Sequence, residues 1–267
     1  MKSRPSRPRA SDLLRDRASR GSYHFSTEQL ANELGVSLTA ARSALRRLKN
    51  KGLVATPHRG FHVVVPPEHQ RLGCPPAEQF VPQLMDRLAV PYYAGLLTSA
   101  RYHGAAHQQP QVFQVVVPRN RPPIHCGLVK VGFVARHNGA AMPTRRVNTP
   151  RGFLRIASPE VTAYDLVGYE RHCGGLENVA TVLSELGESL DPEELSALGE
   201  LSPIPWSQRL GFLLDLVGHS SRSKALAGFV QGHAIETAVL VPGGNKASAK
   251  RDANWKLLVN ADLEPDL

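Results

Sequence analysis

The fold of the N-terminal part is decided by residues 37–65, which read SLTAARSALRRLKNKGLVATPHRGFHVVV. Apolar side chains recur there at spacings of three, four and three, at Leu38, Ala41, Leu45 and Leu48. That periodicity is typical of an amphipathic helix with one buried face. The hydroxyl of Ser37 can accept a hydrogen bond from the first turn, so we expect the helix to begin after Ser37 and to close at Gly52.

A second helix is expected directly before this one. Ser26 and Gln29 form the pattern of a capping box, in which each side chain bonds the other residue's backbone N–H. Leu30 and Leu34 give its buried face, and Gly35 ends it. Two helices joined by a short turn with glycine form a helix-turn-helix, whose second helix lies in the major groove of DNA.

Two strands are expected after these helices, over residues 53–56 and 61–65, where β-branched and aromatic side chains are frequent. A tight turn at residues 57–60 joins them, and Gly60 suits a positive φ. A hairpin in this position is the wing of a winged helix. We therefore expect an α+β chain that opens with a winged helix-turn-helix domain and continues with a mixed α/β domain.

The positive charge of the chain is concentrated at its N-terminus. Residues 1–65 hold thirteen Lys and Arg against four Asp and Glu, which accounts for the entire formal charge of +9. A short helix over residues 10–20 follows an arm in which Pro5 and Pro8 exclude a helix. A basic domain before a neutral one is typical of a protein whose first part binds a polyanion. A basic tail that only aids solubility is the alternative.

The residues expected to contact DNA come from the arm, the second helix of the helix-turn-helix and the wing. Advancing about 100° per residue places Thr39, Ser43, Arg46 and Arg47 opposite the apolar face, where they can reach base edges. Arginine prefers guanine O6 and N7, and the other basic side chains would bind phosphates. A winged helix that binds protein instead would have a less basic face. The full set is Arg4, Arg7, Arg9, Ser37, Thr39, Arg42, Ser43, Arg46, Arg47, Lys49, His58 and Arg59.

Length and composition fit a globular protein of two domains, because 42% of the 267 residues are hydrophobic. No apolar run approaches the roughly 20 residues that span a bilayer, and the arginine-rich N-terminus lacks the apolar stretch of a signal peptide. We therefore expect a cytoplasmic protein with no membrane contact. Cys74, Cys126 and Cys173 are far apart and odd in number, which favours reduced thiols over disulfides or a metal clamp.

The rest of the chain predicts a second domain with a small sheet and several helices. Residues 68–77, rich in proline, are expected as a linker between residues 1–67 and a C-terminal domain of residues 78–267. Strands are expected over residues 112–117, 127–136 and 153–156, and a last pair, 236–241 and 255–259, would form a hairpin or join the sheet at an edge. Helices are expected over residues 78–88, 91–103, from Ser158 onward, and over 176–186, 192–198, 205–217 and 222–230.

No set of residues in the second domain predicts catalysis. His103 and His107 have a helical metal spacing, but a glycine interrupts the helix and no third ligand follows. Asp165 and Glu170 point to different faces of one helix, and Asp165 beside Arg171 fits a surface ion pair. Neither a phosphate-binding glycine loop nor a nucleophile motif occurs. We therefore expect no enzyme, no metal site and no cofactor.

Several stretches taken together resemble the AbiEi family of abortive-infection antitoxins. In the first domain they are FSTEQLANELG at residues 25–35, LRRLKNKG at residues 45–52 and Arg59-Gly60-Phe61. In the second domain they are PYYAGLL at residues 91–97, Ala100, His103-Gly104, IASPE at residues 156–160 and Asp165-Leu166. The chain departs from the family at Phe61-His62, where a wing tyrosine is common, and the tail after Leu201 matches loosely.

The resemblance implies an antitoxin of a type IV toxin–antitoxin system, encoded beside a nucleotidyltransferase toxin. It implies that the winged helix binds operator DNA as a transcriptional repressor of the shared operon, including its own gene. The C-terminal domain would counter toxicity, with no tight toxin complex assumed. A monomer with one winged helix would occupy an inverted repeat as two copies. Two other functions stay open: a one-component regulator whose C-terminal domain senses a small molecule, and an adaptor that holds protein partners.

Overall fold

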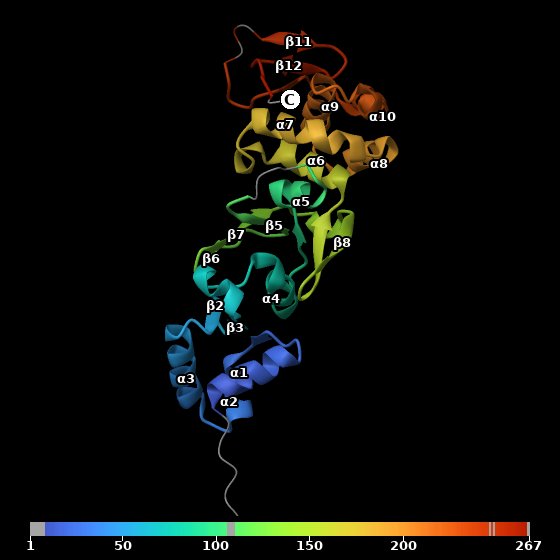
Figure 1. The fold of residues 1–267 in the computed structure, drawn as a ribbon. Helices are drawn as coiled ribbons and strands as arrows, with labels where there is room; N and C mark the ends of the chain where they lie inside the picture. Colours follow the sequence, from blue (N-terminus) through green and yellow to red (C-terminus); the bar gives the residue numbers. More distant parts are fainter. Residues whose placement is uncertain (1–8, 106–109, 246, 248, 266–267) are drawn as a thin grey trace, which may run out of the picture.

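The computed structural model describes residues 9–105, 110–245, 247 and 249–265. Figure 1 shows an elongated molecule with the N-terminal helices at one end, a six-stranded sheet in the middle and a layer of helices with a small sheet at the other end. Three hydrophobic cores follow one another along the chain. The fold is therefore α+β, as the sequence predicts.

The first core lies between three helices and the three strands of the wing. The helices are α1 (Ala10–Ser19), α2 (Thr27–Leu34) and α3 (Leu38–Asn50). The capping box is present, because the backbone N–H of Gln29 donates to Ser26 Oγ at 3.1 Å and that of Ser26 to Gln29 Oε1 at 2.7 Å. Gly35 ends α2 with a φ of +62°, a conformation that glycine adopts without strain. The predicted helix-turn-helix is confirmed.

The wing is a three-stranded antiparallel sheet in the order β1-β3-β2. Its strands are β1 (His24–Phe25), β2 (Val54–His58) and β3 (Phe61–Val64). The two longer strands were predicted, and His58 pairs with Phe61 across the turn. The strand β1 was not expected, because two residues are too few to show an alternating pattern.

Both faces of the wing are buried. Val64 belongs to the first core with Leu45 of α3, whereas Phe61 and Val63 belong to a second core with Phe80 and residues of the central sheet. Successive side chains of a strand point to opposite faces, so one strand contributes to two cores. The wing thus packs against the N-terminal helices with one face and against the rest of the molecule with the other.

The segment between the wing and the central sheet is packed. It forms two 3-10 turns, Pro67–Leu72 and Ala77–Gln79, before helix α4 (Val81–Arg87). Cys74 is fully buried, and the N–H of Leu128 donates to the carbonyl oxygen of Leu72 at 2.8 Å. The division of the chain into residues 1–67, a linker at 68–77 and residues 78–267 stays a prediction.

The central sheet has the strand order β6-β7-β5-β4-β9-β8. The strands are β4 (Tyr93–Ala94), β5 (Phe113–Val117), β6 (Ile124–Cys126), β7 (Val129–Ala135), β8 (Thr144–Thr149) and β9 (Gly152–Ala157). Parallel pairs join β4 to β9 and β5 to β7, and the other pairs are antiparallel. Strands β6 and β8 were not expected; β8 reads TRRVNT and holds one aliphatic side chain, so it lacks the alternation of a half-buried strand.

The helix expected over residues 91–103 is wrong in its first half. Tyr93 and Ala94 pair with β5 as a strand, and helix α5 (Leu96–Tyr102) begins only after Gly95. Pairing with two neighbouring strands decides the conformation of Tyr93 and Ala94, which local propensity cannot do.

A layer of helices covers one end of the sheet (Figure 1). They are α6 (Pro159–Gly168), α7 (Leu176–Leu186), α8 (Pro192–Ala197), α9 (Ile204–Leu216) and α10 (Ser220–His233). The expected start at Ser158 is confirmed, because Ser158 Oγ accepts from the N–H of Val161 at 3.3 Å. The last strands, β10 (Ala238–Val239), β11 (Lys250–Asp252) and β12 (Leu257–Val259), form a separate sheet in which β10 and β12 are parallel. The predicted hairpin or edge addition of these segments is therefore wrong.

The surface ion pair expected at Asp165 is also wrong, because Asp165 is fully buried. Its carboxylate accepts from Arg136 Nη1 at 2.6 Å and from the hydroxyl of Tyr93 at 2.8 Å. Burial raises the pKa of the Asp165 carboxyl, and Arg136 and Tyr93 oppose that rise. The guanidinium of Arg136 also donates to Asn138 and Ser202. One network thus joins the sheet, α6 and the segment before α9.

We predict that Asp165→Ala lowers the free energy of unfolding by about 3–5 kcal/mol, because it leaves the buried guanidinium of Arg136 without its counter-charge. Tyr93→Phe, which removes one hydrogen bond to a charged group, should cost about 1.5–3 kcal/mol. Urea denaturation of the full chain measures both. Asp86→Ala at an exposed carboxylate is the matched control. A loss at Tyr93→Phe no larger than at Asp86→Ala would contradict the importance of the network.

Candidate nucleic-acid interface

Helix α3 presents a polar face to solvent. Ala41, Ala44, Leu45 and Leu48 are its buried side chains. Helical geometry of about 100° per residue places Thr39, Ser43, Arg46 and Asn50 in one stripe opposite them. Arg42 and Arg47 lie on the two sides of this stripe, so Arg47 is at its border and not in it, and Lys49 lies further round; Thr39, Arg42, Arg46, Arg47 and Lys49 are exposed, while Ser43 is half-buried. We call Thr39, Arg42, Ser43, Arg46, Arg47 and Lys49 the α3 basic face.

Leu38 departs from its expected place on the apolar stripe, because 43% of its surface is exposed. It lies in the first turn of α3 at the border of the buried sector, whereas Ala44 completes that sector. Ser37 caps the helix, and its Oγ accepts from the N–H of Ala40 at 3.3 Å. The Ser37 hydroxyl therefore already serves the helix, although it lies at the edge of the face.

The cations of the α3 basic face have no carboxylate within ion-pair distance among the residues that the structure describes. The arginines of α1 differ, because Arg15, Arg17 and Arg20 pair with Asp12, Glu33 and Asp16. Unpaired cations on one helix face leave a positive potential that attracts a polyanion. The α3 basic face therefore has the positive potential that attracts phosphate groups.

Arg17 holds α1 against the rest of the domain. Its guanidinium pairs with Glu33 of α2, donates to the carbonyl oxygen of His24 at 2.7 Å and lies over the ring of Phe25. These contacts fix α1 behind α2 and β1. Arg17 thus acts in the fold and not as a free cation.

The wing tip carries the two expected side chains. Arg59 is exposed and His58 is half-buried, with its Nδ1 3.1 Å from the carbonyl oxygen of Arg59. A further cation lies beside them: a Cβ at Gly60 would be 3.8 Å from Nη2 of Arg87, an exposed residue of α4. The sequence could not indicate Arg87, because only packing of the wing on the C-terminal part brings it there. Arg87 extends the basic surface at the wing tip.

Of the arm residues, Arg4 and Arg7 lie outside the described residues. Arg9 is exposed and directly precedes α1, where its carbonyl oxygen accepts from the N–H groups of Asp12 and Leu13. The side chain of Arg9 is therefore available to a ligand.

His62 fills the space between the wing and α2. Its Nε2 lies 3.0 Å from Thr27 Oγ1 and its Nδ1 2.9 Å from Thr56 Oγ1. The pKa of His62 is lowered to about 4, chiefly by burial and also by Lys49 and Arg87, while Glu28 opposes the shift. The neutral ring satisfies both threonines, because one nitrogen donates and the other accepts. His62 is thus a structural residue.

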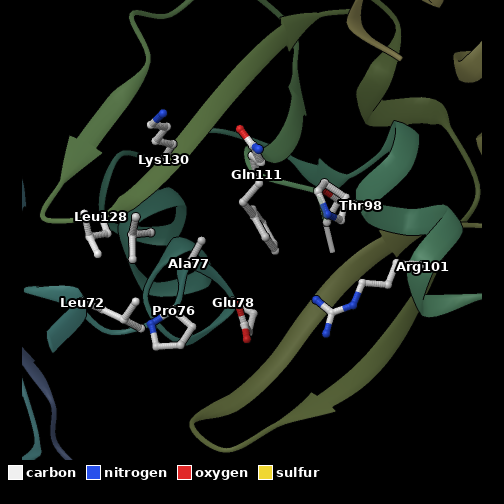
Figure 2. A pocket seen from close by; sticks show the side chains of 12 residues that line it. Leu72, Pro76, Ala77, Glu78, Thr98, Arg101, Gln111, Leu128 and Lys130 are labelled. Carbon is white, nitrogen blue, oxygen red and sulfur yellow. The ribbon is translucent and has the colours of Figure 1, made fainter. Parts of the chain in front are cut away.

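The C-terminal part holds a small cavity of about 170 Å³ between the 3-10 turns, α5 and the start of β5. Glu78, Arg101, Gln111, Phe113 and Lys130 are among its lining residues, and Figure 2 shows Arg101 extending toward Glu78. This mixture of charges and one aromatic ring could bind a small polar molecule. The cavity is smaller than the roughly 300–1,000 Å³ of ordinary ligand sites.

Other residues considered as sites are used in the fold. His103 Nε2 lies 2.8 Å from the carbonyl oxygen of Ala157, and His107 lies outside the described residues. Cys74, Cys126 and Cys173 are buried free thiols. Within residues 9–105, 110–245, 247 and 249–265, no three His, Cys, Asp or Glu side chains gather as metal ligands. No helix in this part of the chain is both long and apolar enough to cross a bilayer.

Comparison with known proteins finds two family models on this chain. Residues 12–65 match the model described as "Transcriptional regulator, AbiEi antitoxin" and residues 93–216 match "AbiEi antitoxin C-terminal domain". The crystal structure of RV2827C protein from Mycobacterium tuberculosis has a similar fold, with a TM-score of 0.67 and 18% identity over 93% of this chain and 90% of that chain. No curated protein matches the chain.

The lowered pKa of His62 should make the free energy of unfolding depend on pH. Its folded pKa of about 4 lies below the usual 6.5, so the unfolded chain binds a proton between these values that the folded chain does not. Stability from the neutral ring is complete above pH 6.5 and is lost as the pH falls toward 4. We predict that His62→Gln, which keeps a donor and an acceptor, reduces the loss of unfolding free energy between pH 7.5 and pH 5. Equal losses in both proteins, measured by urea denaturation, would contradict this.

Proposed function

Because the chain belongs to the AbiEi antitoxin family, with a transcriptional regulator domain followed by an AbiEi domain, we propose that it is an antitoxin that represses its own operon. The winged helix binds operator DNA, and the C-terminal domain counters the toxin. The toxin is a nucleotidyltransferase encoded beside it. The observation that carries the repressor role is the α3 basic face, a row of exposed cations without carboxylate partners among the described residues.

Recognition divides between base edges and phosphates. With α3 in the major groove, Arg46 and Arg47 have the reach and the paired N–H groups to bind guanine O6 and N7, while Thr39 and Ser43 can contact any base. Lys49, Arg59 and the arm residues bind phosphates, which position the protein without selecting sequence. Ser37 and His58 stand at the ends of these surfaces and are placed with the phosphate contacts.

One chain carries one winged helix, so an inverted repeat takes two copies of a monomer, one on each half-site. The packed wing fixes the direction in which each copy projects its C-terminal domain from the duplex, since Phe61 and Val63 are buried with the central sheet. Neutralisation requires no catalytic reaction of the antitoxin itself. The buried Asp165 and the half-buried His103 are occupied by structural hydrogen bonds.

A second candidate is a one-component regulator, and the cavity beside Arg101 and Lys130 is the observation in its favour. A small anion there would have to change the affinity for DNA, because a ligand acts only through its different affinity for two states. The volume of about 170 Å³ is small for this role. An unchanged operator affinity of the Arg101→Ala and Lys130→Ala variants would dismiss it.

We predict that operator binding by the full chain weakens with salt, with log K falling by about 0.9 per neutralised phosphate for each tenfold rise in salt. Lys49→Ala should reduce that slope by about 1 and weaken all sequences alike, because a phosphate contact is lost. Arg46→Ala should cost about 1–3 kcal/mol and relax selectivity at one base pair. Fluorescence anisotropy on cognate and scrambled duplexes measures both, with Arg171→Ala at a distant exposed site as control. Equal losses on the two duplexes would make Arg46 a phosphate contact.

A charge reversal separates repression from neutralisation. Arg46→Glu with Arg47→Glu should abolish repression, since the groove face then repels phosphate, and the chain should still fold because Ala41, Leu45 and Leu48 are unchanged. Cells that express the toxin from an unrelated promoter should still be rescued by this double variant. Arg119→Glu with Arg171→Glu, which changes the charge equally at exposed sites, should affect neither readout. A folded double variant that fails to rescue would show that neutralisation depends on DNA binding.

A further inference from the structure

The β8–β9 hairpin carries a second concentration of positive charge. Residues 142–157 hold four arginines and no acidic residue. They are Arg145, Arg146, Arg151 and Arg155. The strand β8 is the edge of the six-stranded sheet, so the hairpin lies at the side of the molecule. In Figure 1 it stands on the opposite side of the long axis from α3, and the two basic surfaces are separate.

The register of the hairpin collects its polar side chains on one face. Arg146 lies directly opposite Arg155, and Asn148 opposite Phe153. These four residues are exposed, whereas Leu154, on the other face, is fully buried in the second core. We call Arg146, Asn148, Phe153 and Arg155 the hairpin face.

Two features of the hairpin face are unfavourable for the isolated protein. Like charges directly opposite each other on a strand pair destabilise it, and within the described chain neither Arg146 nor Arg155 has a carboxylate at ion-pair distance. Phe153 is 52% exposed, although a large aromatic side chain gains most from burial. The arginines alone would keep this edge strand from pairing with other chains. Protection of the edge therefore does not explain why Phe153 is exposed.

The hairpin face also combines charge with a stacking surface. The guanidinium Cζ of Arg146 lies over the Phe153 ring, 4.2 Å from its centre, so a cation and an aromatic ring are already in contact. Unpaired bases stack on aromatic rings and on arginine guanidinium planes, and the adjacent phosphates bind cations. Asn148 adds a donor and an acceptor beside the ring.

The hairpin is held in place before any ligand arrives. At its tip, the guanidinium of Arg151 lies 3.8 Å from the centre of the ring of Tyr23, which belongs to the N-terminal domain. The side chain of Gln83 in α4 donates to the carbonyl oxygen of Arg151 at 3.1 Å. A face fixed in this way loses little conformational entropy on binding.

From these observations we propose that the hairpin face binds single-stranded nucleic acid, with Arg146 and Arg155 on phosphates and Phe153 stacked with a base. This site is independent of the operator site, because it lies on other elements and favours unpaired bases. It gives the C-terminal part of the chain a polyanion ligand of its own.

The test uses the full chain and fluorescent 12-nucleotide single strands, oligo-U RNA and oligo-T DNA, in anisotropy titrations at two salt concentrations. Arg146→Glu with Arg155→Glu should weaken single-strand binding at least tenfold and leave operator duplex binding within twofold. Phe153→Ala should weaken it about fivefold or more, as expected when a stacked base is lost. The ratio of the RNA and DNA affinities identifies which single strand is the ligand.

Two control variants make the result decisive. Arg119→Glu with Arg251→Glu alters the charge equally at exposed sites elsewhere and should leave single-strand binding unchanged. Arg46→Glu with Arg47→Glu should abolish operator binding and spare single-strand binding, so that failure of one site is distinguished from failure of the other. The proposal is overturned if the control pair weakens binding as much as the hairpin pair, if Phe153→Ala binds like the unaltered chain, or if operator duplex competes for the hairpin face.

Discussion

The ion pair between Asp165 and Arg136 determines how the helical layer is attached to the central sheet. Two charges removed from water cost several kcal/mol each, and their attraction compensates only where further hydrogen bonds complete both groups. Arg136 follows strand β7, Asp165 lies in the middle of α6, and the hydroxyl of Tyr93 reaches the same carboxylate from β4. Because Arg136 also bonds Ser202 just before α9, the pair fixes elements that are distant in sequence in one arrangement.

A similar constraint joins the two functional parts of the chain. The wing is a projecting hairpin in many DNA-binding domains, but here Phe61 and Val63 are buried with Phe80 and the central sheet. The orientation of α3 relative to the C-terminal part is thus set by packing on a shared sheet. The turns at residues 67–79 contribute to the same core through Cys74 and Ala77. Residues 1–67 taken alone would expose the apolar face of the wing that Phe61 and Val63 form.

Elements held by contacts between residues close in sequence were predictable from the sequence, and those held by contacts between distant residues were not. The helices α2, α3 and α6 were predictable because Ser26, Ser37 and Ser158 bond backbone groups within three residues, and the α3 basic face was predictable because it belongs to one helix. The strand at Tyr93 was not, since it exists only through pairing with β5 and β9. Burial of Asp165 depends on Arg136, 29 residues away, and Arg87 reaches the wing tip only through tertiary packing. Such contacts leave no periodic trace in the sequence.

The shared wing limits how the two parts of the molecule can influence each other. A ligand changes operator affinity only if it binds two states of the protein differently, and the states must differ where the parts touch. Those contacts include the core around Phe61 and Val63 and the contact of the Arg151 guanidinium with the Tyr23 ring at the hairpin tip. Arg151 lies in the turn that joins the two strands of the hairpin face. A nucleic acid held by the hairpin face would therefore lie on the same hairpin whose tip contacts the winged helix through Arg151 and Tyr23.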